Sequence, residues 1–185
     1  MKWKRNLVVV MATLLFINFN SWSQSGQHST NQKTNKKMET ATIERNETIV
    51  RAVFEQAINE RKPELLKNYI ADEFVGARGA RGAAGFLEPI KPLLAAFPDI
   101  RWHIEETVAD GNKVAVRWRW TGTHKATFVS LEPTGKTISS DGMAIFELKD
   151  GKVIAANVQT DRLGFLQAMD VLPTDINQLY KMKSN

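Results

Sequence analysis

Residues 97–166 read FPDIRWHIEETVADGNKVAVRWRWTGTHKATFVSLEPTGKTISSDGMAIFELKDGKVIAANVQTDRLGFL, and this stretch decides the fold. Within it apolar and polar residues alternate, most clearly from Val114 to Thr121. A period of two is typical of β-strands. Turn signals at residues 110–112, 133–136 and 150–151 separate the alternating runs. The stretch therefore predicts consecutive antiparallel strands.

Upstream of this stretch the apolar period becomes that of a helix. In residues 43–60, apolar side chains recur every three or four positions and predict an amphipathic helix with one buried face. They are Ile49, Val50, Val53, Phe54, Ala57 and Ile58. A shorter helix is predicted after Pro63, and a third over residues 86–97, with Pro89 and Pro92 near its start. The glycine-rich residues 77–85 are predicted to form a flexible loop.

Helices followed by antiparallel strands predict an α+β domain with its helices gathered on one face of a curved sheet. We expect this single domain to span residues 43–185, since about 140 residues suffice for a real core. Residues 24–42 are polar and lack apolar periodicity, so they are predicted to form a disordered leader.

The first 23 residues are predicted to be a secretory signal peptide. Lys2, Lys4 and Arg5 precede a short apolar run from Leu7 to Ile17, and small residues follow at positions 21 and 23. The run is about 11 residues long, whereas a bilayer requires roughly 20, so the pattern favours a signal peptide over a membrane anchor. We expect a periplasmic or secreted protein without stable membrane insertion after cleavage.

The formal charge of +5 comes from the N-terminal residues rather than from the domain. Residues 1–23 carry three positive charges and residues 24–42 carry three lysines against one glutamate, which leaves the domain without net charge. This balance gives no support for a nucleic acid partner. The chain has no cysteine, which excludes disulfides, thiol nucleophiles and thiolate metal sites.

Asp161 lies where the last predicted strand meets a helix-like run, a position suited to proton transfer. By strict alternation it shares a strand face with Val153, Ala155, Asn157 and Gln159. The more polar face of a sheet normally contacts solvent, so alternation alone favours a solvated acid. The other interpretation is a polar-lined pocket on the concave side of the sheet.

His124 ends the strand that carries Trp118 and Trp120. Its imidazole is interpreted either as a donor to a substrate carbonyl or proton relay, or as a hydrogen-bonded turn residue. The tryptophans, with Trp102, are interpreted as core or as an aromatic pocket wall, and strand spacing favours core.

Four arginines of the domain are interpreted as surface residues. Arg117 and Arg119, on the opposite strand face from the tryptophans, are expected to pair with Glu105 or other surface acids. Arg78 and Arg81 are interpreted as part of a solvated loop rather than an anion-binding lid. The sequence contains no His spacing typical of metal sites and no GxSxG nucleophile motif.

Five short motifs resemble, in order and spacing, the SnoaL-like polyketide (ester) cyclase family of the NTF2-like superfamily. They are Phe97-Pro98-Asp99, Gly122-Thr123-His124, Pro133-Thr134-Gly135-Lys136, Asp150-Gly151-Lys152 and Asp161-Arg162-Leu163-Gly164. Asn46 and residues 71–75 are similar to the opening segment of that family. The resemblance spans about residues 43–172. It implies an NTF2-like cone-shaped barrel, in which N-terminal helices and a curved antiparallel sheet enclose a deep apolar pocket.

The resemblance also implies acid/base chemistry without metal or organic cofactor. An aspartate at the position of Asp161 acts as general acid/base in an intramolecular aldol ring closure, and we expect His124 to assist. Substrate contacts are expected from Phe97, Trp118, Trp120 and Asn157. The chain departs from the family at residues 77–78, where a histidine is common, at residues 125–127, where a glycine is usual, and at residues 155–157, where a Glu-His-Trp type of cluster is common.

The leading hypothesis is an exported enzyme for aldol-type cyclisation or isomerisation of a small apolar carbonyl compound. The first alternative is a non-catalytic NTF2-like binding module for a hydrophobic small molecule. A further alternative is an interaction domain that forms a homodimer through its sheet.

Overall fold

The computed structural model describes residues 21–175, 177 and 178, with side chains from residue 32 onward. The chain divides into two compact units, Met1–Met38 and Glu39–Asn185. Most of the predicted signal peptide, residues 1–20, lies outside the described residues. Among the helices in the described part of the chain, none is both long and apolar enough to cross a membrane.

Helix α1 (Ser21–Ala52) includes residues 24–42, for which a disordered leader was predicted. That prediction relied on the missing apolar stripe, whereas the helix-forming Gln, Lys, Glu, Met and Ala residues of this segment favour helix through backbone propensity. The helix continues as a π-helical segment, η1 (Val53–Ile58). The predicted amphipathic helix is confirmed here, because Val50, Val53, Phe54, Ala57 and Ile58 are all buried.

The remaining N-terminal helices are short. They are η2 (Pro63–Leu65), α2 (Leu66–Tyr69), α3 (Gly82–Leu87) and α4 (Lys91–Ala96). The third helix predicted over residues 86–97 is divided into α3 and α4, because Pro89 between them cannot donate a backbone hydrogen bond within a helix, whereas Pro92 lies in the first turn of α4, where it is tolerated. The predicted flexible loop already contains the first turn of α3, where a Cβ on Gly85 would lie 2.0 Å from the carbonyl oxygen of Ala80.

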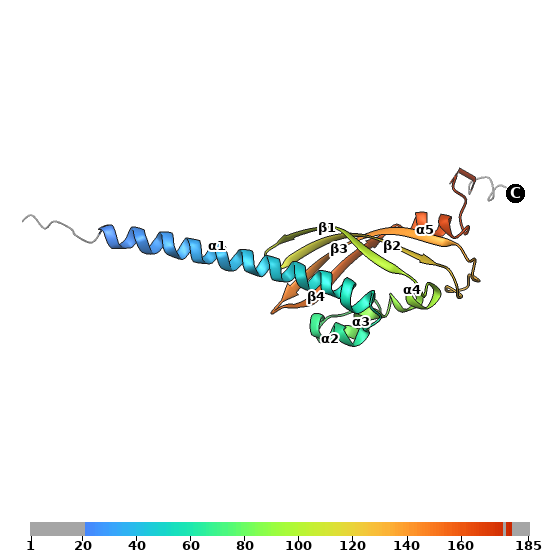
Figure 1. The fold of residues 1–185 in the computed structure, drawn as a ribbon, viewed down its shortest axis with the longest axis horizontal. Coiled ribbons are helices and arrows are strands. Elements are labelled where there is room, and N and C mark those ends of the chain that lie inside the picture. Colours follow the sequence, from blue (N-terminus) through green and yellow to red (C-terminus); the bar gives the residue numbers. More distant parts are fainter. Residues whose placement is uncertain (1–20, 176, 179–185) are drawn as a thin grey trace, which may run out of the picture. The chain divides into compact units, whose positions relative to one another are not determined.

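In the described part of the chain, four antiparallel strands form one sheet in the order β1-β2-β3-β4. The strands are β1 (Arg101–Asp110), β2 (Lys113–Thr123), β3 (Thr137–Lys149) and β4 (Lys152–Thr160). Helices α2, α3 and α4 lie on one side of this sheet, below it in Figure 1. The α+β prediction is therefore confirmed. The sheet is curved but does not close into a barrel.

The core lies between the helices and the inner face of the sheet. The three tryptophans of β1 and β2 are buried on this face, so they belong to the core. Phe54 of η1 contacts Trp118 with a ring-centroid distance of 5.4 Å and Phe146 of β3 at 6.0 Å. Aromatic packing thus joins the first helix to the centre of the sheet.

Gly142 leaves the space that the indole ring of Trp118 occupies. The two residues are opposite each other on β3 and β2, and a Cβ on Gly142 would lie 2.7 Å from the indole ring. We predict that Gly142→Ala lowers the free energy of unfolding by about 1–3 kcal/mol, because the indole has to move. Urea unfolding measures this loss. In a double-mutant cycle, Trp118→Phe should relieve part of the penalty; strictly additive effects would contradict the packing argument.

A β-bulge in β4 changes which residues share a face. The pairing shifts between Glu147 and Leu148, so Val153 is buried opposite Leu148, whereas Asn157 lies opposite Ile145 on the outer face. Strict alternation placed Val153 and Asn157 on one face. The extra residue of a bulge interrupts such alternation, so the sequence-based assignment of β4 faces was wrong at Val153.

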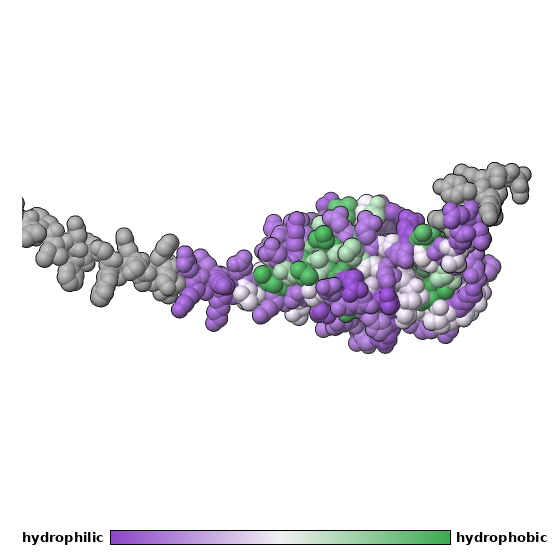
Figure 2. Space-filling model, turned by 90° about the horizontal axis from the view of Figure 1, so that it is seen from above, coloured by the Kyte–Doolittle hydropathy of each residue, from purple (hydrophilic) through white to green (hydrophobic). Residues whose placement is uncertain are grey.

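The outer face of the sheet carries ion pairs around exposed apolar residues. Arg117 pairs with Glu105 and Glu106, and Arg119 Nε lies 2.6 Å from Asp141 Oδ1. The pairing predicted for both arginines is therefore confirmed. Figure 2, which views the molecule from above, shows apolar residues gathered between hydrophilic ones. The large apolar side chains exposed on the outer face are Val108, Met143 and Ile145.

Candidate functional site

The segment before β1 is attached to the end of β2. Asp99 Oδ1 accepts a hydrogen bond from the Thr123 N–H, and Asp99 Oδ2 accepts one from the Thr123 hydroxyl, both at 2.7 Å. Phe97 stacks on His124 with a ring-centroid distance of 5.1 Å. The motifs Phe97-Pro98-Asp99 and Gly122-Thr123-His124 therefore form one structural unit.

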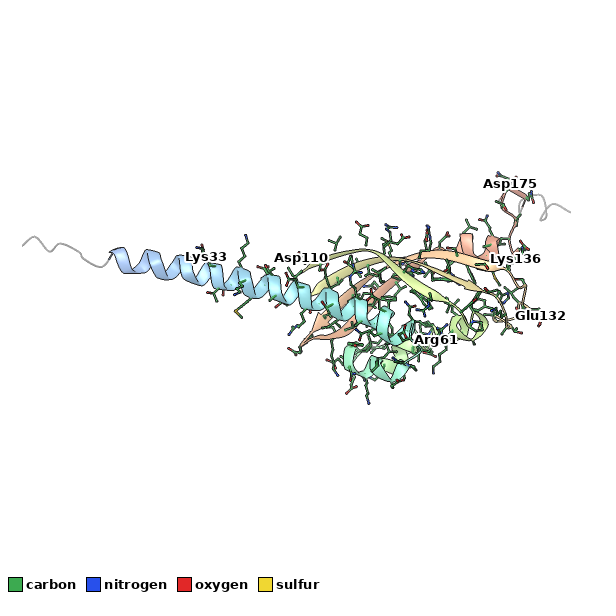
Figure 3. The ribbon with its side chains drawn as sticks, viewed as in Figure 1. Lys33, Arg61, Asp110, Glu132, Lys136 and Asp175 are labelled. Carbon is green, nitrogen blue, oxygen red and sulfur yellow. The ribbon has the colours of Figure 1, made fainter. Side chains whose placement is uncertain are left out.

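The Pro133–Lys136 turn folds back onto His124. The His124 N–H donates to the Lys136 carbonyl, and the Gly135 N–H donates to the His124 carbonyl, both at 2.9 Å. The Thr134 N–H donates to His124 Nδ1 at 3.2 Å. Lys136, labelled in Figure 3, forms an ion pair with Asp170. Three motifs that are distant in sequence thus meet at this histidine.

His124 is completely buried, and its two ring nitrogens have different surroundings. Nδ1 lies 3.2 Å from the backbone nitrogen of Thr134 and 3.2 Å from its hydroxyl oxygen. Nε2 has no hydrogen-bond partner among the described residues. The imidazole is therefore a hydrogen-bonded turn residue through Nδ1, while Nε2 is left for another partner.

An aromatic cluster surrounds Phe97, and we define it as Phe97, Trp120, Phe128 and Phe165. Phe97 contacts Trp120, Phe128 and Phe165 at ring-centroid distances of 5.3, 6.2 and 6.3 Å, respectively. Phe165 also contacts Trp120 at 5.8 Å and Phe128 at 5.4 Å. Phe97 and Trp120 are buried, whereas Phe128 and Phe165 are half-buried. The cluster is therefore apolar core beside His124, and only Phe128 and Phe165 are partly exposed.

Asp161 lies between β4 and helix α5 (Arg162–Ala168) and forms the N-cap of that helix. Its Oδ1 accepts a hydrogen bond from the Gly164 N–H at 2.8 Å, and its side chain is exposed. Its backbone N–H donates to the Asp141 carbonyl of β3 at 2.9 Å. The carboxylate is therefore held at a defined position at the end of the sheet.

The predicted site residues are only partly brought together. Phe97, Trp120 and His124 are in contact, and Asp161 is connected to them through Phe165, which lies one helical turn further along the chain. Trp118 lies elsewhere in the core, against Phe54 and Gly142. Asn157 is exposed on the outer face of the sheet, away from these residues. Its predicted contact with the substrate stays a prediction.

Sequence reasoning missed three residues of this region: Thr134, Phe128 and Phe165. Thr134 belongs to a recognised motif, but its contact with His124 depends on how the turn folds back. Phe128 lies outside every periodic run, and Phe165 indicated only a helix.

A separate cleft of about 180 Å³ lies between η1, α3 and α4, away from these residues. It is lined by Ala57, Ile58, Arg61, Pro63, Leu87 and Leu94. Arg61, labelled in Figure 3, donates from Nη2 to the carbonyl of Pro98 at 2.8 Å and to that of Ile100 at 3.2 Å. This arginine thus ties the end of η1 to the segment before β1.

The SnoaL-like polyketide cyclase family model matches residues 48–169, which include all five motifs. Four of them meet or flank this site, whereas Asp150-Gly151-Lys152 forms the β3–β4 turn at the other end of the sheet. The chain belongs to this family. The resemblance inferred from the motifs is confirmed by this match. No curated protein matches the chain in sequence.

Solved structures of SnoaL-like proteins share the fold. A protein from Acidithiobacillus ferrooxidans, assigned as a polyketide cyclase, is 29% identical with a TM-score of 0.62, over 68% of this chain and 94% of that one. A SnoaL-like protein from Jannaschia is 22% identical with a TM-score of 0.63, over 71% and 96%. IdmH from Streptomyces antibioticus is 24% identical with a TM-score of 0.60, over 68% and 99%.

Acid should weaken the attachment of Asp99 to Thr123. Hydrogen bonds from the Thr123 N–H and hydroxyl hold the pKa of Asp99 below its usual value, and Lys125 at 3.7 Å acts in the same direction. Because the folded pKa is lower than the unfolded value of about 3.9, the ionised carboxylate stabilises the fold above that pH. This contribution is lost as the pH falls through the folded pKa.

We therefore predict that Asp99→Asn lowers the melting temperature near neutral pH but makes it less sensitive to acid. Thermal unfolding of both proteins between about pH 2 and pH 7 measures the difference. The two curves should converge at low pH, where the wild-type carboxyl is protonated. A constant difference at every pH would contradict the prediction.

Proposed function

We propose that this protein is an exported SnoaL-like enzyme that carries out acid/base chemistry on a small apolar carbonyl compound, either an aldol-type cyclisation or an isomerisation. The observation that carries the proposal is the meeting of three family motifs at His124. Its imidazole is buried beside an aromatic cluster, and its Nε2 has no hydrogen-bond partner in the described part of the chain. Asp161, one helical turn before Phe165 of that cluster, supplies the carboxylate.

Both reactions begin with the same proton transfer. The Asp161 carboxylate takes a proton from the carbon next to a carbonyl, and the electron pair of that C–H bond moves into an enolate. In an aldol closure the enolate carbon attacks a second carbonyl, and Asp161 returns its proton to the alkoxide oxygen that this attack forms. In an isomerisation Asp161 returns the proton at another carbon. The negative charge of the enolate lies on the oxygen of the substrate's own carbonyl group. A positioned acid/base of this kind contributes roughly 10²–10⁴ in rate.

The ligand class follows from the character of the aromatic cluster. Aromatic rings such as Phe97 and Trp120 favour flat apolar ligands, and a small number of polar groups near them would fix the orientation of the ligand. The assignment of structural relatives as polyketide cyclases supports the reaction class.

Export favours isomerisation, because polyketide intermediates are made in the cytoplasm. Export itself is proposed from residues 1–23 alone, and the mass of the mature protein in an envelope or secreted fraction tests it.

Deuterium exchange tests the proposed chemistry without knowledge of the natural substrate. The protein is incubated in D₂O with a small benzo-fused cyclic ketone, 2-tetralone, and exchange at the two carbons next to the carbonyl is followed by NMR. We expect exchange well above the buffer rate. Native mass spectrometry of protein from its own host adds the identity of a retained ligand. A retained apolar ligand without exchange would instead favour the binding module.

We further propose a homodimer formed through the outer face of the sheet. Its large apolar side chains are well exposed, with fractions of 62% for Val108, 55% for Met143 and 51% for Ile145. The flanking ion pairs of Arg117 and Arg119 place both charge signs on the same face. A two-fold dimer needs such a self-complementary surface.

We predict that Ile145→Lys converts the dimer to a monomer, because it places a charge in the apolar part of this face. Sedimentation velocity measures the oligomeric state. Val129→Lys is the matched control, since Val129 is 83% exposed in the Phe128–Leu131 turn and lies outside the sheet. A monomeric wild type, or a dimer that survives Ile145→Lys, would contradict the proposal.

A further inference from the structure

The hydrogen bonds of His124 decide which ring nitrogen carries the proton. A backbone N–H is always a donor, so Nδ1, which receives the Thr134 N–H at 3.2 Å, must offer a lone pair. The Thr134 hydroxyl oxygen accepts from the Lys136 N–H at 3.3 Å, which leaves its own proton free to point to Nδ1. Both groups therefore disfavour a proton on Nδ1.

In the neutral ring the proton then lies on Nε2. This nitrogen is buried and has no partner among the described residues. A buried donor without an acceptor costs about 1–3 kcal/mol, and buried polar groups in native structures are nearly always paired. The Nε2–H is therefore available to an acceptor outside the described residues.

The neighbours of His124 do not supply that acceptor. Phe97 stacks on the imidazole, and the aromatic cluster around it consists of carbon rings and one indole N–H donor. The complementary group is thus an oxygen with a lone pair, and a ligand carbonyl or enolate oxygen has this chemistry.

We propose that Thr134 holds His124 as the Nε2-protonated tautomer, so that His124 donates a hydrogen bond to the carbonyl or enolate oxygen of the ligand and does not act as a base. In the proton transfer described above, the C–H proton moves to Asp161 and the charge develops on the ligand oxygen. The Nε2 proton stays on His124 and stabilises that charge. Thr134 is a positioning residue. The identity of the ligand oxygen rests on the proposed function, whereas the tautomer does not.

Nitrogen-15 NMR of the imidazole tests the tautomer in the ligand-free protein. We expect one neutral form with Nε2 protonated. Thr134→Val keeps the backbone N–H and should keep this form, whereas Thr134→Pro removes the N–H and should allow the other tautomer to appear. A protonated Nδ1 in the wild type, or a Thr134→Pro protein with an unchanged tautomer, would overturn the positioning role.

Two substitutions of His124 separate its two nitrogens. The Asn side chain places a carbonyl near Nδ1 but has no group near Nε2, whereas the Gln amide reaches the position of Nε2. Both remove the stacking on Phe97, so the informative comparison is between them. We expect His124→Asn to lose about 10²-fold in deuterium exchange of 2-tetralone, the effect of a missing oxyanion donor, and His124→Gln to retain a larger share. Equal rates in the two variants would overturn the donor role.

Ligand addition gives a readout that does not need turnover. Addition of 2-tetralone to the wild type should shift the Nε2–H resonance, and Asp161→Asn should show the same shift because it leaves His124 unchanged. A wild-type protein that shows the shift of Nε2–H but no exchange above the buffer rate would count against the proposed chemistry only. A protein that turns over 2-tetralone without any shift of Nε2–H would overturn the inference.

Discussion

Replacing Asp161 by Asn is expected to lower the deuterium exchange of 2-tetralone by about 10²–10⁴-fold with little change in melting temperature. The amide cannot take the proton. It can still cap helix α5, because Asn is as good an N-cap as Asp and its side-chain oxygen can accept from the Gly164 N–H. The variant therefore removes the chemistry and keeps the fold.

Two further substitutions at Asp161 separate catalysis from capping. Asp161→Ser keeps a capping oxygen without a carboxylate, and it should be as inactive as Asp161→Asn. Asp161→Ala removes both functions and should also lose about 0.5–2 kcal/mol of stability. Exchange rates by NMR and urea unfolding of the same samples measure both effects. If the Asn and Ser variants exchanged 2-tetralone at the wild-type rate, Asp161 would serve only as a structural helix cap.

Truncation of Phe97 should produce the largest loss of stability. Its ring is completely buried and contacts Trp120, His124, Phe128 and Phe165. Phe97→Ala removes these contacts and leaves a cavity, so we expect the free energy of unfolding to fall by about 3–5 kcal/mol. The chain has no disulfide to compensate. Urea unfolding followed by tryptophan fluorescence measures the loss, since Trp120 is one of the affected rings.

Phe128→Ala is the matched control within the same cluster. Phe128 is only half-buried, so its truncation should cost clearly less than that of Phe97. Both variants should also weaken binding of 2-tetralone, because both remove apolar surface beside His124. Equal losses of stability in the two variants would show that the cluster is not organised around Phe97.

Local periodicity was sufficient for the elements of this fold. The alternation from Val114 to Thr121 predicted a strand, and the helical spacing from Ile49 to Ile58 predicted a buried helical face; both are present. The pairing of Arg117 and Arg119 followed from the same alternation. These predictions succeed because the period of a helix or strand is a property of neighbouring residues.

Departures from regular geometry were not visible in the pattern. The bulge opposite Leu148 places Val153 in the core and leaves Asn157 on the outer face, although both occupy odd positions of one strand. A single unpaired residue produces this change, and it depends on how β3 and β4 fit together. Asn157 itself lies on the solvent-facing side that alternation favoured for this face.

For the candidate site as well, the sequence determined some features and the tertiary structure determined others. The motifs around Asp161, His124 and Phe97 identified the family and the residues worth testing, because residue types and spacing persist in the linear sequence. Only the tertiary structure decided that Asp161 caps α5, that Phe165 connects it to Phe97, and that Thr134 bonds to Nδ1 of His124. The physical reason is that the contact of Phe165 with Phe97 joins segments far apart in the chain, while the Asp161 cap and the Thr134 hydrogen bond depend on how the backbone turns at those points. The partners are selected by packing and hydrogen-bond satisfaction in the folded protein.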